Sequence, residues 1–192
     1  MKIRYNAPVV LTFTFASAFI LVLSQTLLHS LTVQWFAVPG KAGFSPASFR
    51  NWITLFTHVL GHGSWSHLGS NFMVILLIGP ILESTYGSPS LLGMISITAL
   101  VTGALNVLFF SSGLLGASGV VFMMILLASF TNFNKGEIPL TFILVLVLYL
   151  GMELINSFGS SGENISHFAH IVGGFCGSLF GFFRIPGAKR PG

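Results

Sequence analysis

The sequence has few charged residues, no aspartate and a single cysteine. Charged side chains make up 6% of its 192 residues, whereas a soluble domain carries roughly a quarter. Because 53% of the residues are hydrophobic and the mean hydropathy is +0.88, the composition excludes an ordinary soluble protein and indicates one that lies in a bilayer. The lone Cys176 excludes an internal disulfide and a cysteine-based metal cluster.

Long apolar runs separated by turn-rich breaks predict an all-α polytopic membrane protein with six spans. One domain is expected over residues 1–192, with short tails at 1–7 and 185–192. Residues 35–57 mix Trp and Phe with Pro, Lys and Arg, which is typical of a segment at the membrane interface. The expected spans are residues 8–31, 68–82, 91–110, 115–133, 138–157 and 165–183.

Lysine and arginine lie mainly on one side of this topology, which predicts cytoplasmic termini and an outer loop at residues 35–57. Because these cations end apolar segments, they concern membrane orientation, and no nucleic-acid partner is expected. The short charged N-terminus has no transit signature, which favours a prokaryotic inner membrane. Ala16-Ser17-Ala18 resembles a signal-peptide cleavage site, but the apolar run continues well past it. The predicted cytoplasmic cations are Lys2, Arg4, Lys135, Arg184, Lys189 and Arg190, against Lys41 and Arg50 outside.

Polar side chains inside the expected spans are costly in a bilayer, so each requires a partner or a function. Counting along ideal helices places Ser118 about 25 Å, and His170 about 21 Å, from the cytoplasmic ends of their spans. The same count from Glu83 gives about 24 Å for His67 and about 18 Å for Asn71. In a hydrocarbon core of about 30 Å, all four lie at one depth below the outer surface, where water can reach them.

A serine and a histidine at one depth suggest nucleophilic catalysis, in which the imidazole takes the hydroxyl proton and returns it to the leaving amine. The chain has no aspartate, and Glu163 is expected about 10 Å further out along the helix, so a Ser118–His170 dyad fits better than a triad. His67 and Asn71 share one helix face and offer N–H donors for an oxyanion hole, beside backbone N–H groups at the Ser118 helix start. This chemistry requires no metal.

Glycines are expected to bring the serine and histidine helices together. His170, Gly173 and Gly177 fall on one face of the last span, and glycines on such a face let two backbones approach closely. Phe122, one turn after Ser118, is expected beside the imidazole, where it would hold the ring in place.

Several motifs, in this order and spacing, resemble the rhomboid family of intramembrane serine proteases. The G-x-S-G nucleophile turn appears as Gly116-Ala117-Ser118-Gly119, and the A-H-x-x-G-x-x-x-G helix appears at residues 169–177. The H-x4-H-x3-N segment lies at residues 62–71, and the E-x3-G ending of the second span lies at residues 83–87. The resemblance covers residues 50–183.

This resemblance implies six spans around a water-filled cavity, no cofactor, and cleavage of transmembrane protein substrates near the outer face. It implies substrate access around residues 140–166. Two positions depart from the family pattern, since Phe49 stands before Arg50 where Trp is common, and Phe122 replaces a common Tyr and so lacks its hydroxyl. The implied roles are nucleophile for Ser118, general base and then acid for His170, oxyanion donors for His67 and Asn71, and support for Gly116, Gly119, Phe122, Gly173 and Gly177.

Other functions remain open from the residues alone. A metal site could draw on the histidines, but His62 is interpreted as a loop residue that bonds neighbouring carbonyls, and His167 as solvated. A rhomboid-like protein that binds membrane segments without cutting them is a second alternative, although such relatives usually lack the serine or the histidine. A transporter fits less well, because the polar residues do not form a path to the inside. The role of Glu153 and the identity of the substrate stay open. The histidines considered for a metal site are His58, His62, His67, His167 and His170.

Overall fold

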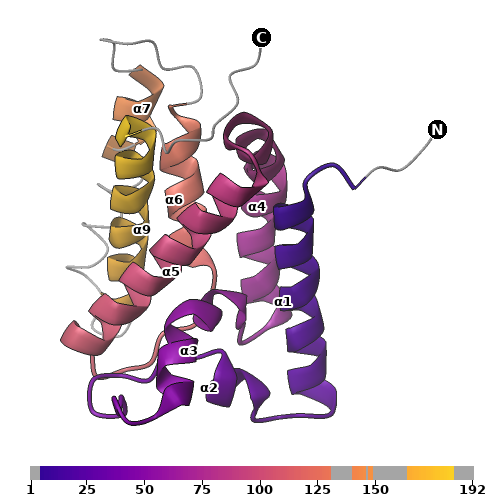
Figure 1. Cartoon of the computed structure of the whole chain (residues 1–192), viewed down its shortest axis with the longest axis vertical. Coiled ribbons are helices and arrows are strands. Elements are labelled where there is room, and N and C mark those ends of the chain that lie inside the picture. The colour runs from indigo at the N-terminus through magenta and orange to yellow at the C-terminus, as the bar shows by residue number, and fades with distance from the viewer. Residues whose placement is uncertain (1–4, 131–139, 146, 149–163, 184–192) are drawn as a thin grey trace.

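The computed structural model describes residues 5–130, 140–145, 147–148 and 164–183. These residues form a helical bundle that contains no β-strand (Figure 1). The prediction of an all-α protein is therefore confirmed for this part of the chain. Residues 1–4 of the N-terminal tail, the C-terminal tail and most of the expected fifth span, including Glu153, lie outside the described residues. The elements are α1 (Pro8–Thr26), α2 (Leu31–Trp35), α3 (Phe49–Thr57), the 3-10 turn η1 (His58–Leu60), α4 (Trp65–Tyr86), α5 (Ser88–Phe109), α6 (Ser118–Ala128), α7 (Leu140–Val145) and α9 (Asn164–Phe183).

Three of the described helices, α1, α4 and α5, are long and apolar enough to cross a membrane. They correspond to the first three expected spans. Their outward surfaces carry large apolar side chains, with Phe15, Phe19, Leu77 and Ile81 all exposed. A soluble bundle would place polar residues there, so the protein is an integral membrane protein.

Helix boundaries follow from local chemistry at residues 64–88. The hydroxyl of Ser64 accepts the backbone N–H of His67 at 3.1 Å and caps the start of α4. Gly87 ends α4 with φ = 83°, a left-handed conformation that favours glycine, and α5 begins at the next residue. The two helices are thus joined through a single residue.

A buried carboxylate fastens the first helix to this α4–α5 corner. Glu83 accepts the backbone N–H groups of Val9 at 2.9 Å and Val10 at 3.0 Å, and the hydroxyl of Ser88 at 2.7 Å. The first N–H groups of a helix have no partner within the helix and attract negative charge. Glu83 therefore satisfies the start of α1 while standing near the end of α4.

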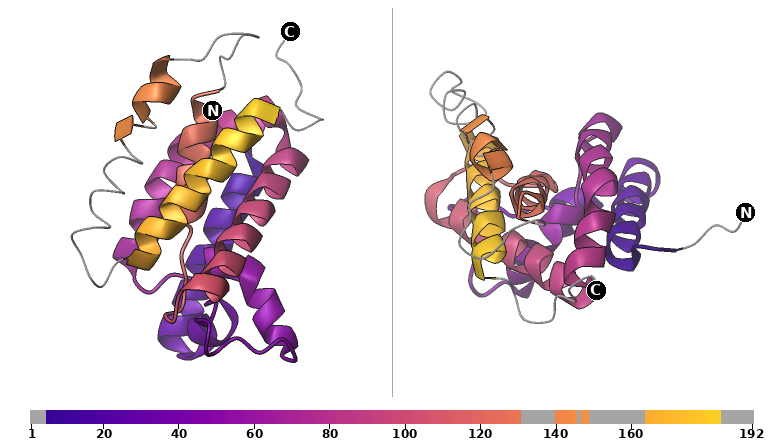
Figure 2. Two further views of the ribbon diagram at one scale, coloured as in Figure 1. Left: turned by 90° about the vertical axis from the view of Figure 1, so that its left-hand side faces the viewer. Right: turned by 90° about the horizontal axis from the view of Figure 1, so that it is seen from above.

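Helix α6 lies at the centre of the described bundle, in contact with α4, α5 and α9 (Figure 2). Its side chains are buried on every face, including Val120, Met123, Met124 and Leu127. A helix that is apolar all round is one that is surrounded by protein or lipid. Ser118 therefore begins a helix that is held from several sides.

Helix α3 exposes two aromatic rings and buries two polar side chains. In α3, Phe49 and Trp52 are exposed, whereas Asn51 and Thr54 are buried. Helices α2 and α3 lie together at one end of the bundle (Figure 1). Outward aromatic rings are typical of helices at a membrane interface.

Replacing Glu83 with glutamine should lower stability, because an amide NH2 group would then face backbone N–H donors that need an acceptor. The expected loss is about 1–3 kcal/mol, seen as a fall of several degrees in Tm of the purified protein in detergent. Ser84→Ala is the matched control, since its hydroxyl is exposed and bonds only to the Ile81 carbonyl. An unchanged Tm for Glu83→Gln would show that this carboxylate does not hold α1.

Candidate active site

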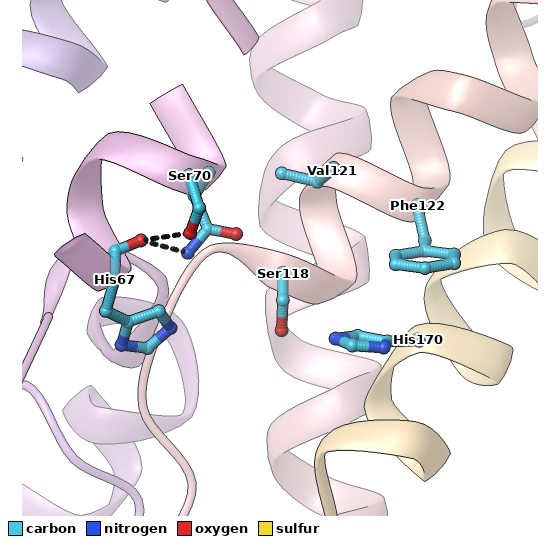
Figure 3. A pocket seen from close by; sticks show the side chains of 7 residues that line it. His67, Ser70, Ser118, Val121, Phe122 and His170 are labelled. Carbon is cyan, nitrogen blue, oxygen red and sulfur yellow. Dashed lines mark hydrogen bonds between the residues drawn. The ribbon is translucent and has the colours of Figure 1, made fainter. Parts of the chain in front are cut away.

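A cavity of about 320 Å³ opens between α4, α6 and α9 (Figure 3). It brings together the four polar residues that the sequence places at one depth, although they are up to about a hundred residues apart in the chain. Two further lining residues, Ser70 and Val121, were not singled out from the sequence. The lining residues are His67, Ser70, Asn71, Ser118, Val121, Phe122 and His170.

The turn before Ser118 requires glycine at position 116. Gly116 has φ = 115°, a backbone conformation that side-chain-bearing residues rarely adopt. A Cβ atom there would also lie 2.7 Å from Cε1 and 2.8 Å from Nε2 of His67. The turn thus brings the backbone against the His67 ring and places Ser118 at the first position of α6, where the backbone N–H groups have no intrahelical acceptor.

Residues of the segment between α1 and α4 hold this turn in place through backbone hydrogen bonds. Val38 and Leu114 exchange N–H···O bonds of 2.9 and 3.0 Å. The N–H of Gly116 donates to the carbonyl of His58 at 2.9 Å. These contacts are not predictable from residue type, because backbone pairing between distant loops leaves no periodic pattern.

His170 presents its ring to the cavity from α9 and is stacked on Phe122. The ring centroids are 4.3 Å apart and the planes differ by 8°. Figure 3 shows the Ser118 side chain beside this ring. A serine hydroxyl and an imidazole thus line the same cavity.

Helices α6 and α9 approach closely at two glycines. A Cβ atom on Gly173 would lie 2.0 Å from the Gly119 carbonyl oxygen, and one on Gly177 would lie 2.2 Å from that of Met123. Gly119 is itself close to α9, because a Cβ there would lie 3.3 Å from the Ala169 carbonyl oxygen. These glycines therefore set the separation between the serine and histidine helices.

His67 and Asn71 reach the cavity from the first turns of α4. The Asn71 amide donates to the His67 carbonyl at 2.9 Å, and the Ser70 hydroxyl donates to the same carbonyl at 3.0 Å. An amide nitrogen carries two hydrogens, so Asn71 keeps a second donor. Ser70 lies three residues after His67, and that helical spacing is the signal by which it could have been found.

The remaining histidines differ in their surroundings. His167 is 8% exposed, so the prediction that it is solvated is wrong; it shares the inward face of α9, which packs on α5 and α6. His58 is buried with its Nδ1 donating to the Thr54 carbonyl at 3.3 Å, and burial lowers its pKa to about 4. His62 donates in the same way to the Leu60 carbonyl at 3.3 Å, as expected for a loop residue. Among the residues that the structure describes, no three histidine, cysteine or acidic side chains gather as metal ligands.

Adding one methyl group at Gly177 should separate the two site helices. Gly177→Ala would press its Cβ on the Met123 backbone, which is expected to cost about 1–3 kcal/mol and to lower Tm together with any activity of the site. Gly93→Ala is the matched control, because nothing lies within 4 Å of a Cβ there and its Tm should stay level or rise. Thermal unfolding in detergent measures both, and equal Tm values would contradict the proposed close contact.

Comparisons with known proteins agree with this arrangement. A family model described as "Rhomboid domain" matches residues 50–187. The chain is 26% identical over 129 residues to the rhomboid protease GlpG of Haemophilus influenzae, and the alignment covers 66% of each chain. The chain thus matches just under two thirds of that relative's length. The matched region contains His67, Asn71, Ser118 and His170, and the chain belongs to the rhomboid family.

Proposed function

We propose that this protein is an intramembrane serine endopeptidase that cleaves membrane-anchored protein substrates near the outer face of the bilayer. The observation that carries the proposal is the shared cavity, in which Ser118 from α6 and His170 from α9 meet His67 and Asn71 from α4. A hydroxyl, an imidazole and two N–H donors around one space are the groups that acyl transfer requires. The name of the relative, a rhomboid protease, supports the same reaction class.

In the proposed reaction, His170 takes the Ser118 proton as the serine oxygen attacks the scissile carbonyl carbon. The carbonyl oxygen becomes an oxyanion, which accepts N–H groups from His67, Asn71 and the backbone at the start of α6. His170 then gives its proton to the leaving amine. Water, activated by the same imidazole, hydrolyses the acyl-enzyme and frees Ser118.

A dyad requires the histidine to be oriented without an aspartate. Stacking on Phe122 can supply this orientation, because parallel rings 4.3 Å apart restrict rotation of the imidazole. Glu83, the acidic residue that the described part of the chain contains, is engaged with α1 and Ser88. Its carboxylate therefore serves to join α1 to the α4–α5 corner.

The proposed topology has six spans, with both termini in the cytoplasm and residues 35–57 outside. The excess of lysine and arginine at the predicted cytoplasmic ends supports this orientation. With α1, α4 and α5 each long enough to span, Ser118 follows the outer end of the third span. Water then reaches the cavity from the outside, substrates approach around residues 140–166, and a prokaryotic inner membrane is the proposed location.

A fluorophosphonate probe tests the nucleophile directly. The wild-type protein, purified in detergent, should become covalently labelled, and Ser118→Ala should not label because the attacking oxygen is absent. His170→Ala should slow labelling by about 10³-fold or more, with a Tm close to that of the wild type. In-gel fluorescence against time measures the rate.

Ser70→Ala is the matched control, because it removes a hydroxyl from the same cavity and should leave labelling intact. Labelling that persists in Ser118→Ala would overturn the proposed nucleophile. A folded wild-type protein that neither labels nor cleaves a membrane substrate would favour a binding protein in place of a protease.

A further inference from the structure

The His67 ring is held in place by packing rather than by hydrogen bonds. Within the described ranges no residue hydrogen-bonds to its ring nitrogens, and its hydrogen bonds are those of its backbone N–H and carbonyl. One edge of the ring, with Cε1 and Nε2, lies against the backbone of Gly116. A histidine ring that no hydrogen bond orients depends on packing against its neighbours to point its N–H in one direction.

His62 is the neighbour on another side of this ring. The two imidazole centroids lie 5.0 Å apart with their planes at 63°, an edge-to-face contact. His62 is 1% exposed, and its ring also contacts Phe72, with centroids 5.6 Å apart. An exposed loop histidine could rotate freely, whereas this one is enclosed.

The orientation of His62 is itself fixed. Its Nδ1–H donates to the Leu60 carbonyl at 3.3 Å. In the neutral ring Nε2 then carries no hydrogen, and no described group donates a hydrogen bond to it. Burial, followed by the proximity of His67, lowers the pKa of His62 to about 4. The ring is therefore neutral at pH 7, and it can lie against His67 without charge repulsion.

We propose that His62 is a positioning residue that holds the His67 ring against Gly116 and so directs a His67 N–H into the cavity. The proposal rests on the proposed function, because it gives His62 a purpose only if His67 stabilises an oxyanion. An oxyanion donor acts in the transition state and not in substrate binding. Loss of His62 is accordingly expected to lower kcat and to leave KM nearly unchanged.

His62→Asn separates positioning from loop structure. The shorter amide can keep a donor near the place of Nδ1, and so the bond to the Leu60 carbonyl, but it removes the part of the ring that contacts His67. We expect a Tm near that of the wild type and a fall of about tenfold in kcat or in the fluorophosphonate labelling rate. His62→Leu, which fills the volume without a ring, should show the same loss and serves if the asparagine variant does not fold.

A double-mutant cycle with His67→Ala decides whether His62 acts through His67. His67→Ala alone should cost about 10²-fold, and adding His62→Asn should cost almost nothing more, because the positioned group is gone. The exposed His29→Ala is the control and should have no effect in either background. A tenfold loss that persists in the His67→Ala background, or full activity in His62→Asn and His62→Leu, would overturn the positioning role while leaving the protease intact. A wild type without labelling or cleavage would instead overturn the proposed function, and this role with it.

Discussion

The close contact of α6 and α9 is the constraint on which the site depends. Gly173 and Gly177 leave no room for a Cβ against the backbone of α6, so these helices meet at a separation that only glycine permits. In a bilayer, where lipid competes equally well for apolar side chains, such backbone proximity is a main source of helix association. The same contact sets His170 beside Phe122 and the Ser118 turn.

The segment between α1 and α4 supports the turn before Ser118 from a second direction. It pairs Val38 with Leu114 and accepts the Gly116 N–H on the carbonyl of His58. It also delivers His62 to the edge of His67. The serine turn is consequently fixed by helix packing on one side and by loop backbone on the other. Preorganised donors of this kind are the usual means of stabilising charge in a transition state.

Much of this arrangement was predictable because a bilayer restricts what a sequence can do. Polar residues in apolar runs are few, so counting residues along helices predicts that Ser118, His170, His67 and Asn71 lie at one level. The structure places all four around one cavity. Contacts between individual side chains were harder to predict from the sequence. Counting gives depth but not the direction in which a helix faces its neighbours, which explains the error at His167; its face of α9 is covered by protein. The backbone pairing of the segment between α1 and α4 and the bond from Asn71 to the His67 carbonyl have no signature in residue type.

We propose that Ser118 and His170 cut a peptide bond within the membrane, near its outer face. The most direct test is cleavage of a single-span reporter protein by the purified enzyme in proteoliposomes, with the products sized by intact mass spectrometry. We expect a cut in the outer half of the reporter span by the wild type, and an intact reporter with Ser118→Ala. An intact reporter with the wild type, or the same fragments from Ser118→Ala, would contradict this proposal.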